Sequence, residues 1–316
     1  AMTIVSQILS VIDPTAGDQP AMERAAWVAR NTGAELELFI CYYNEYLSAG
    51  PLFDSKSLQS TRKEVLDGYE KYLESLAAPL RESGLTVRTR AVWDHPLSDG
   101  IVRHAAAIGA DLVFKDTHHH SAISRALLTN TDWSLIRGCA SPLWLVKRGD
   151  LPKKPVILAA IDPMNEHDKP AALDDEILLL SKSLAEASSA EVRVFHSYDP
   201  RVAIATATAN AYIPVSLPFD EIEKQMREQH EQRFNEIIEF HEIGPDHAHL
   251  VAGLAHEELP ALAKKLHALV VVMGAVARNP LKRLFIGSTA ERTLGQIPCD
   301  MLIVKPSWVH TAVDDA

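Results

Sequence analysis

The amino-acid sequence contains an internal repeat as long as a whole domain. Residues 11–14, Val-Ile-Asp-Pro, return as Ala-Ile-Asp-Pro at 160–163, and residues 144–147, Trp-Leu-Val-Lys, return as Leu-Ile-Val-Lys at 302–305. The first pair is offset by 149 positions (11 to 160) and the second by 158 (144 to 302), so the second copy carries nine extra residues. Solenoid repeats recur every ~20–50 residues. The chain is therefore predicted to be a tandem of two domains.

Length and composition fit two globular domains. The chain has 316 residues, of which 47% are hydrophobic and 23% are charged, and two units of roughly 150 residues match the usual domain size. No apolar run approaches the ~18 residues that a bilayer crossing needs, and the start of the sequence lacks a secretory signal. These features predict a cytoplasmic protein with no membrane segment.

The net charge indicates which partners are expected, and the cysteines indicate whether disulfides or a zinc site are expected. A formal net charge of −11 opposes sequence-independent attraction to nucleic acid and to anionic membranes, so proteins and small molecules are the expected partners. Cys41, Cys139 and Cys299 have no CxxC spacing and predict neither a disulfide framework nor a zinc site.

Short β-rich segments alternate with longer segments of helical period in both copies. In the first copy, strands are expected at 8–12, 35–42, 86–93, 112–115 and 143–147, and helices at about 21–31, 57–83, 98–108 and 131–137. In the second copy, strands are expected at 156–161, 191–196, 247–253, 269–273 and 301–305, and helices near 174–187, 219–241, 257–267 and 289–294. Left-handed helix caps are expected at four glycines that follow predicted helices: Gly33, Gly84, Gly109 and Gly138.

Crossover connections of this length imply parallel sheets with helices on both faces. The predicted fold class is α/β, with two tandem, doubly wound, five-stranded, Rossmann-like domains of strand order 3-2-1-4-5. The predicted domains are 2–147 and 155–306. A charged linker with proline at 148–154 joins them, and 307–316 is expected to form a flexible tail.

The second copy contains a glycine pattern suited to phosphate. Gly274 ends an apolar strand segment, and nine residues after Ala277 come Gly287, Ser288 and Thr289 at the start of a predicted helix. A glycine at a strand end lets the backbone approach a ligand closely. The free N–H groups of a helix's first turn favour phosphate oxygens. Residues 287–289 are therefore the predicted phosphate corner.

The expected strand order places a ligand crevice beyond the carboxyl ends of the first and fourth strands of a domain. In the second copy, Asp162 and Gly274 would be neighbours across this crevice, and Asp162 could accept hydrogen bonds from a base or ribose. Arg278, Lys282 and Arg283 lie between the glycines and could screen phosphate charge.

These residues resemble the universal stress protein family, whose nucleotide-binding members carry Gly-x-x-Gly, nine residues and then Gly-Ser or Gly-Thr. The double architecture is similar to the tandem E-type branch of that family. The resemblance implies that the second half binds ATP or AMP, with Mg²⁺, although alanine replaces the family's second glycine. The cofactor-binding residues that it implies are Asp162, Met273, Gly274, Ala277, Gly287, Ser288 and Thr289.

The first copy lacks every glycine of this pattern. At the offset of 158, Asp116 replaces the first glycine, Thr129 replaces the glycine of the corner, and Asp132 lies in the first turn of the next helix. A carboxylate there interacts favourably with the helix dipole and would repel phosphate, and Asp116 adds a second negative charge. The first half is thus predicted to be structural. Asp13, the counterpart of Asp162, is expected only to hold its own turn.

The last strand of each copy, at 143–147 and 301–305, would be a sheet edge, and exposed edges must be paired or covered. The resemblance implies that the two halves pair along these strands as an internal pseudo-dimer, with Trp144 and Met301 near the seam. The alternative is that a loop covers each edge. Pairing of two whole chains into a homodimer stays open.

Three functions remain under consideration. The first is a non-catalytic stress-response module that binds an adenine nucleotide in its second half. The second is a nucleotide-independent scaffold, whose crevice holds an apolar ligand or nothing and whose 201–218 loop is a lid or docking surface. The third is a slow ATPase or autophosphorylating protein, although the chain lacks a G-x-S-x-G elbow and a Walker lysine.

A metal site is not predicted, although residues 118–120 are three consecutive histidines. Adjacent residues cannot all face one ion in regular geometry, and no H-E-x-x-H pattern accompanies them. A solvated loop is the expected structure for this segment.

Overall fold

The first half of the chain alternates strands and helices. The computed structural model describes residues 5–48, 55–117, 128–147, 149–164, 172–201, 218–275 and 288–306, with only the backbone described at 55, 219 and 288–291. The elements of the first half are β1 (Gln7–Val11), α1 (Pro20–Thr32), β2 (Glu35–Tyr42), η1 (Glu45–Leu47), α2 (Ser55–Glu82), β3 (Val87–Trp93), α3 (Leu97–Ala107), β4 (Leu112–Asp116), α4 (Asn130–Gly138) and β5 (Leu143–Val146).

The second half repeats this order. Its elements are β6 (Val156–Ala160), α5 (Ala172–Ser188), β7 (Glu191–Tyr198), α7 (Phe219–Phe240), η2 (Pro245–His247), β8 (Ala248–Ala252), α8 (Ala255–Lys265), β9 (Val270–Gly274), α9 (Ser288–Gln296) and β10 (Asp300–Val304). The predicted tail at 307–316, the histidines at 118–120 and most of the predicted loop at 201–218 lie outside the described residues.

Local sequence explains where three of the helices end. Gly33, Gly84 and Gly109 adopt φ angles of 75°, 92° and 63°, the left-handed region in which a residue without a Cβ is least strained. The prediction for Gly138 was wrong. It is the last residue of α4, and the chain leaves that helix through Cys139 in an extended conformation with φ −73° and ψ 119°.

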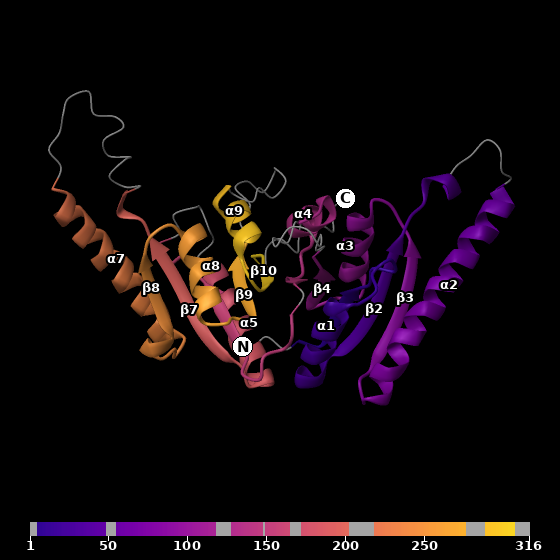
Figure 1. The fold of residues 1–316 in the computed structure, drawn as a ribbon, viewed down its shortest axis with the longest axis horizontal. Helices are drawn as coiled ribbons and strands as arrows, with labels where there is room; N and C mark the ends of the chain where they lie inside the picture. The colour runs from indigo at the N-terminus through magenta and orange to yellow at the C-terminus, as the bar shows by residue number, and fades with distance from the viewer. Residues whose placement is uncertain are drawn as a thin grey trace, which may run out of the picture.

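The ten strands of the described residues belong to one sheet, whose order is β3-β2-β1-β4-β5-β10-β9-β6-β7-β8. Within each half the strands are parallel and follow the order 3-2-1-4-5. Figure 1 shows the two halves side by side, with β3 and β8 at the outer ends. The predicted fold class is confirmed.

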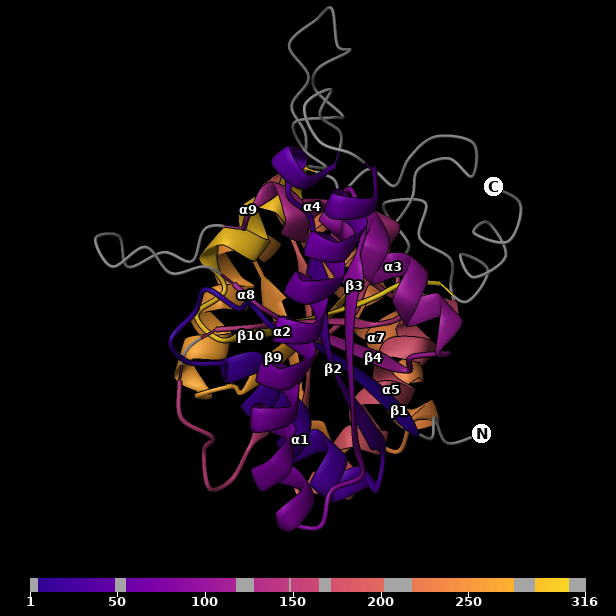
Figure 2. The same ribbon diagram turned by 90° about the vertical axis from the view of Figure 1, so that its right-hand side faces the viewer.

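Helices cover both faces of the sheet, and each face has one apolar core that crosses from one half into the other. One core joins α1, α2, α5 and α7, through residues such as Ala25, Leu73, Leu178 and Phe234. The other joins α3, α4, α8 and α9. The side view in Figure 2 shows helices on either side of the strands. Because both faces are covered, the inner strands are apolar runs rather than alternating sequences.

The two halves meet along β5 and β10, which pair antiparallel. Trp144 lies directly opposite Leu302 in this register, and the two residues are also equivalent at the offset of 158. A pseudo-two-fold axis therefore passes between them, as in the isologous interface of a symmetric dimer. The predicted internal pseudo-dimer, with Trp144 and Met301 at its seam, is confirmed, and the loop-covered alternative is excluded.

Two lysines at equivalent positions form hydrogen bonds across the seam between the halves. The ammonium group of Lys147 donates to the carbonyl oxygen of Ile297, and that of Lys305 donates to the carbonyl oxygen of Cys139. Both lysines are buried, and burial lowers the pKa of Lys305 to about 8. The interface therefore follows the pseudo-two-fold symmetry in its polar contacts as well as in its strand pairing.

One charged cluster breaks that symmetry. Asp300 accepts hydrogen bonds from the indole Nε1 of Trp144 and from the backbone N–H of Lys147, both at 2.9 Å. Its Oδ2 also lies 2.8 Å from Nε of Arg24, which comes from α1 in the other half. Both charged side chains are almost fully buried, at 5% and 3% exposure. The counterpart of Asp300 at the offset of 158 is Pro142, so this ion pair exists on one side of the axis only.

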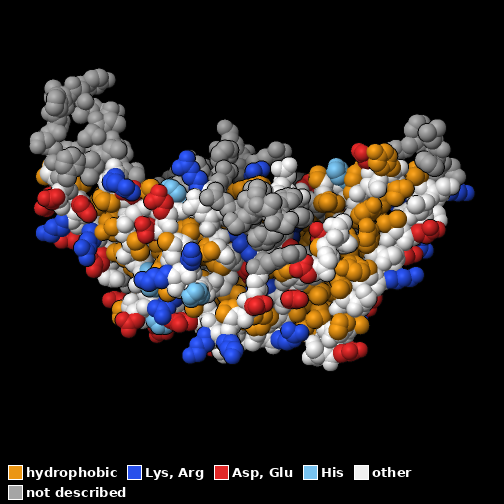
Figure 3. All heavy atoms as spheres, in the orientation of Figure 1, with side chains coloured by type: hydrophobic (Ala, Val, Ile, Leu, Met, Phe, Trp, Pro, Cys, Tyr) orange, Lys and Arg blue, Asp and Glu red, His pale blue; other side chains and the backbone are white. Residues whose placement is uncertain are grey.

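None of the described helices is both long and apolar enough to cross a membrane. Over the described part of the face shown in Figure 3, basic and acidic side chains are interspersed.

Candidate functional site

The predicted crevice of the second half lies where β6 and β9 run side by side. These strands pair in a register that puts Ala160 opposite Met273, and they are the point at which the strand order reverses. Asp162 follows β6 by two residues, while Met273 and Gly274 end β9. The fold thus brings these three predicted residues to one edge of the sheet.

Gly274 has a packing role that the sequence did not reveal. A Cβ added at this glycine would lie 2.6 Å from Cδ2 of Leu173 and 3.4 Å from Cδ1 of Ile177. Both side chains come from α5 and are fully buried. Close approach of a helix therefore requires a glycine here, whether or not a ligand also approaches.

Helix α5 extends further over the crevice than its counterpart α1 does. The two helices end alike, because Gly33 and Ser189 are both left-handed and are separated by 156 positions (33 to 189). At that offset the start of α5, Ala172, corresponds to position 16, whereas α1 begins at Pro20. The extra turn carries Leu173, which covers Gly274.

The backbone of Asp162 is hydrogen-bonded to Asp174 at this edge of the sheet. Its N–H lies 3.1 and 3.3 Å from the two carboxylate oxygens of Asp174, whose side chain is buried in the first turn of α5. Asp174 was not predicted from the sequence. The available signal was the acidic pair at 174–175 at the start of a helix, where the dipole favours negative charge.

The remaining predicted residues are only partly described. Ser288 and Thr289 are the first two residues of α9, as the phosphate-corner prediction requires, but their side chains are not described. Ala277, Gly287 and the three basic residues Arg278, Lys282 and Arg283 lie outside the described ranges. Among the described residues, no group of three histidine, cysteine or acidic side chains has a geometry that could hold a metal ion.

In the first half, Asp116 stands at the position of Gly274. It ends β4, and its Oδ1 accepts the backbone N–H of Ala21, in the first turn of α1, at 2.8 Å. Burial raises the pKa of Asp116 to about 7, an effect that the Ala21 hydrogen bond and Lys115 partly offset. Asp116 therefore ties β4 to α1 across the crevice. Asp13 accepts from the N–H and hydroxyl of Thr15, in the turn that was predicted.

The start of α4 is satisfied from within, as predicted. Thr129 and Asp132 form a capping box, in which the backbone N–H of Thr129 donates to Oδ2 of Asp132 at 2.7 Å and the N–H of Asp132 donates to the Thr129 hydroxyl at 3.2 Å. Asp132 also has a charged partner that was not predicted. Nζ of Lys115 lies 2.7 Å from Oδ1 of this completely buried carboxylate. The start of α4 is thus closed by an ion pair, Lys115 with Asp132, that has no net charge.

Asp116 is expected to make the folded protein less stable as pH rises. The folded-state pKa of about 7 exceeds the ~3.9 of an unfolded chain, so the folded state holds an extra proton between pH 4 and 7, and the stability it gives is lost as pH rises through 7. Asp116→Asn keeps an acceptor for Ala21 and removes the titration. In urea unfolding at pH 5 and pH 8, the wild type should lose more stability than the variant. Equal losses would show that Asp116 does not titrate in this range.

These features define a tandem, doubly wound α/β protein in which Asp116 bridges the crevice of the first half and Gly274 stands at the equivalent position of the second. The model of the universal stress protein family matches residues 5–147 and 156–305. The chain belongs to that family.

Relatives with the same tandem length support this assignment. Universal stress protein E of Escherichia coli strain K12 is 29% identical over 314 residues, which cover 99% of this chain and 98% of that protein. The protein of the same name from Photorhabdus laumondii is 26% identical over 318 residues, covering 100% and 99%. The structure of a putative universal stress protein from Pseudomonas aeruginosa UCBPP-PA14 superposes with a TM-score of 0.75 at 24% identity, covering 98% of this chain and 97% of that one.

Proposed function

We propose that this chain is a stress-response module that binds one adenine nucleotide, ATP or AMP with Mg²⁺, at the crevice between β6 and β9. The phosphates would lie at the start of α9, on Gly287, Ser288 and Thr289, and the adenine end would lie near Asp162. The first half is structural in this proposal. The net charge of −11 favours protein partners in the cytoplasm over nucleic acid.

One observation carries the proposal, which is the difference between the two crevices. In the first half, Asp116 bridges to α1, and the start of α4 is closed by Thr129, Asp132 and Lys115. In the second half, the positions equivalent to Asp116, Thr129 and Asp132 are Gly274, Gly287 and Ala290. A helix start without an acidic cap keeps N–H groups that can bind phosphate oxygens.

A charge placed at the start of α9 is expected to abolish nucleotide binding without unfolding the protein. In Ser288→Asp, the new carboxylate repels phosphates, but it interacts favourably with the helix dipole by about 0.3–1 kcal/mol. Titration calorimetry with ATP and Mg²⁺ should show at least a ~10-fold weaker affinity, and thermal unfolding should show no loss of stability.

Asn130→Asp is the matched control, because Asn130 is the exposed first residue of α4 at the equivalent position in the first half. It should leave ATP affinity unchanged. Equal effects of the two substitutions, or no binding of ATP to the wild type, would contradict the proposed site.

A nucleotide-independent scaffold is the second candidate, and the packing of Leu173 against Gly274 favours it. That contact explains the glycine without a ligand. In this case the wild type would not bind ATP, and Ser288→Asp would affect only stability.

A further inference from the structure

A cavity lies between the two halves, away from the crevice described above. Its volume is about 340 Å³, which falls within the ~300–1,000 Å³ that small-molecule sites occupy. It is lined at the amino ends of β9 and β10 by Leu269 and Asp300 and includes linker residues such as Asp150. The proposed nucleotide crevice lies at the opposite, carboxyl ends of β6 and β9, so the two places are distinct.

Arg24 gives this cavity a buried group that is not fully paired. Its side chain is 5% exposed, and its Nε lies 2.8 Å from Asp300. Its Nη1 is buried and has no hydrogen-bond partner among the described residues. A buried donor without a partner costs free energy, more when it is charged. Arg24 also lines the cavity, so a ligand acceptor placed there would lie beside its guanidinium group.

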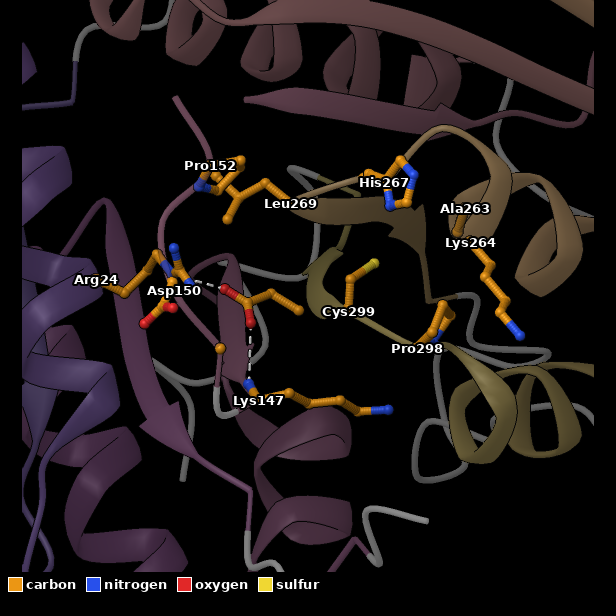
Figure 4. A pocket seen from close by; sticks show the side chains of 13 residues that line it. Arg24, Lys147, Asp150, Pro152, Ala263, Lys264, His267, Leu269, Pro298 and Cys299 are labelled. Carbon is orange, nitrogen blue, oxygen red and sulfur yellow. Dashed lines mark hydrogen bonds and ion pairs between the residues drawn. The ribbon is translucent and has the colours of Figure 1, made fainter. Parts of the chain in front are cut away.

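The walls of the cavity carry more positive than negative charge. Figure 4 shows Arg24 and Asp150 on one side, His267 and Lys264 on the other, and Cys299 between them. Lys147 also lines the cavity, and its ammonium group donates to the carbonyl oxygen of Ile297. With Arg24 and Lys264 it gives three cationic side chains and a histidine around two carboxylates, Asp150 and Asp300. This excess contrasts with the net charge of −11 of the whole chain.

The fold itself does not require these charges, as the other side of the pseudo-two-fold axis demonstrates. At the offset of 156 that relates α1 to α5, the counterpart of Arg24 is Leu180. At the offset of 158, the counterparts of Asp300, Lys264 and His267 are Pro142, Ala106 and Gly109. Leu180 is buried in the apolar core. The same interface is therefore built on that side without an ion pair, which argues that the charged side has an additional role.

We propose that this cavity is a second ligand site, which takes a phosphate monoester of about the size of a sugar phosphate. The phosphate would lie against the guanidinium group of Arg24, and the rest of the ligand would span the cavity towards Lys264 and His267 on its other side, with a hydroxyl group donating to Asp150. A guanidinium group matches the geometry of phosphate oxygens. A phosphate monoester carries about −1.5 to −2 charges at neutral pH, which suits several cations around one cavity.

Titration calorimetry of the full chain at low ionic strength tests this site, with ribose 5-phosphate, inorganic phosphate and unphosphorylated ribose as probes. Ribose 5-phosphate should bind, inorganic phosphate should compete with it, and ribose alone should not bind. The pair of substitutions Lys264→Ala and His267→Asn changes exposed residues, and asparagine tolerates the left-handed φ of 48° at position 267. This variant should bind roughly 5-fold more weakly or worse.

Two controls locate the site. Lys265→Ala removes an exposed neighbouring lysine that does not line the cavity, and it should leave affinity for ribose 5-phosphate unchanged. Ser288→Asp at the nucleotide crevice should also leave it unchanged. The combined variant Arg24→Leu and Asp300→Asn, which resembles the other side of the axis, should abolish binding.

Three results would overturn the second site: no binding of ribose 5-phosphate at millimolar concentration, equal affinity in the Lys264 and His267 variant, or loss of binding in Ser288→Asp. The last result would assign the phosphate to the nucleotide crevice. Failure of ATP to bind would contradict the proposed nucleotide site but not this second site, so each proposal can be contradicted without the other.

Discussion

Asp300→Ala is expected to destabilise the protein by about 3–5 kcal/mol, the usual effect of removing one partner of a buried ion pair. The substitution leaves the buried guanidinium of Arg24 without its anion. It also leaves the indole N–H of Trp144 and the backbone N–H of Lys147 without their acceptor. Urea unfolding monitored by circular dichroism should show the loss as a lower transition midpoint.

Two companion variants separate the charge from the hydrogen bonds. Asp300→Asn keeps one acceptor oxygen, for either Trp144 or Lys147, and should fall between alanine and the wild type. Adding Arg24→Leu to Asp300→Asn removes the unpaired cation and should restore much of the stability, because Leu180 fills the equivalent position in the other half. If Asp300→Ala unfolds like the wild type, the asymmetric cluster does not contribute to the pairing of the halves.

Lys115→Met is expected to have a similarly large effect, of about 3–5 kcal/mol, at the closed crevice of the first half. Lys115 is the cation that pairs with Asp132, whose carboxylate is completely buried at the start of α4. Methionine retains most of the apolar length of lysine, so the loss measured by urea unfolding reports chiefly on the charge.

Adding Asp132→Asn to Lys115→Met tests whether the lost stability comes from the unpaired charge of Asp132. Asparagine can still accept from Thr129 in the capping box but carries no charge, so the double variant should recover most of the lost stability. A loss that persists in the double variant would mean that the packing of Lys115, rather than its charge, holds this helix start.

Much of the fold follows from patterns that the sequence displays directly. The repeated Asp-Pro turns and the two similar last strands predict a tandem, and apolar runs separated by long amphipathic segments predict parallel strands with crossover helices. The seam at Trp144 and Met301 was predictable because the last strand of each half would otherwise be an exposed edge. Gly138 was misassigned because a glycine at the end of a helix can be its last helical residue instead of its left-handed cap.

The contacts within the candidate sites were less predictable, because they join residues that are distant in sequence. Arg24 and Asp300 belong to different halves, and no local pattern connects them. Lys115 occupies a buried strand position, where a lysine is unexpected until Asp132 is known to be its partner. Gly274 was expected to serve a ligand, but the first residues of α5 give it a packing role that depends on where that helix begins.

The difference between the two crevices is tested most directly by counting nucleotides. Native mass spectrometry of the full chain, in the presence of ATP and Mg²⁺, should show one bound adenine nucleotide per chain, and Ser288→Asp should remove it while Asn130→Asp retains it. Two nucleotides per chain would show that Asp116 and Asp132 do not close the first crevice. A chain that binds none would show that the second crevice is not a nucleotide site.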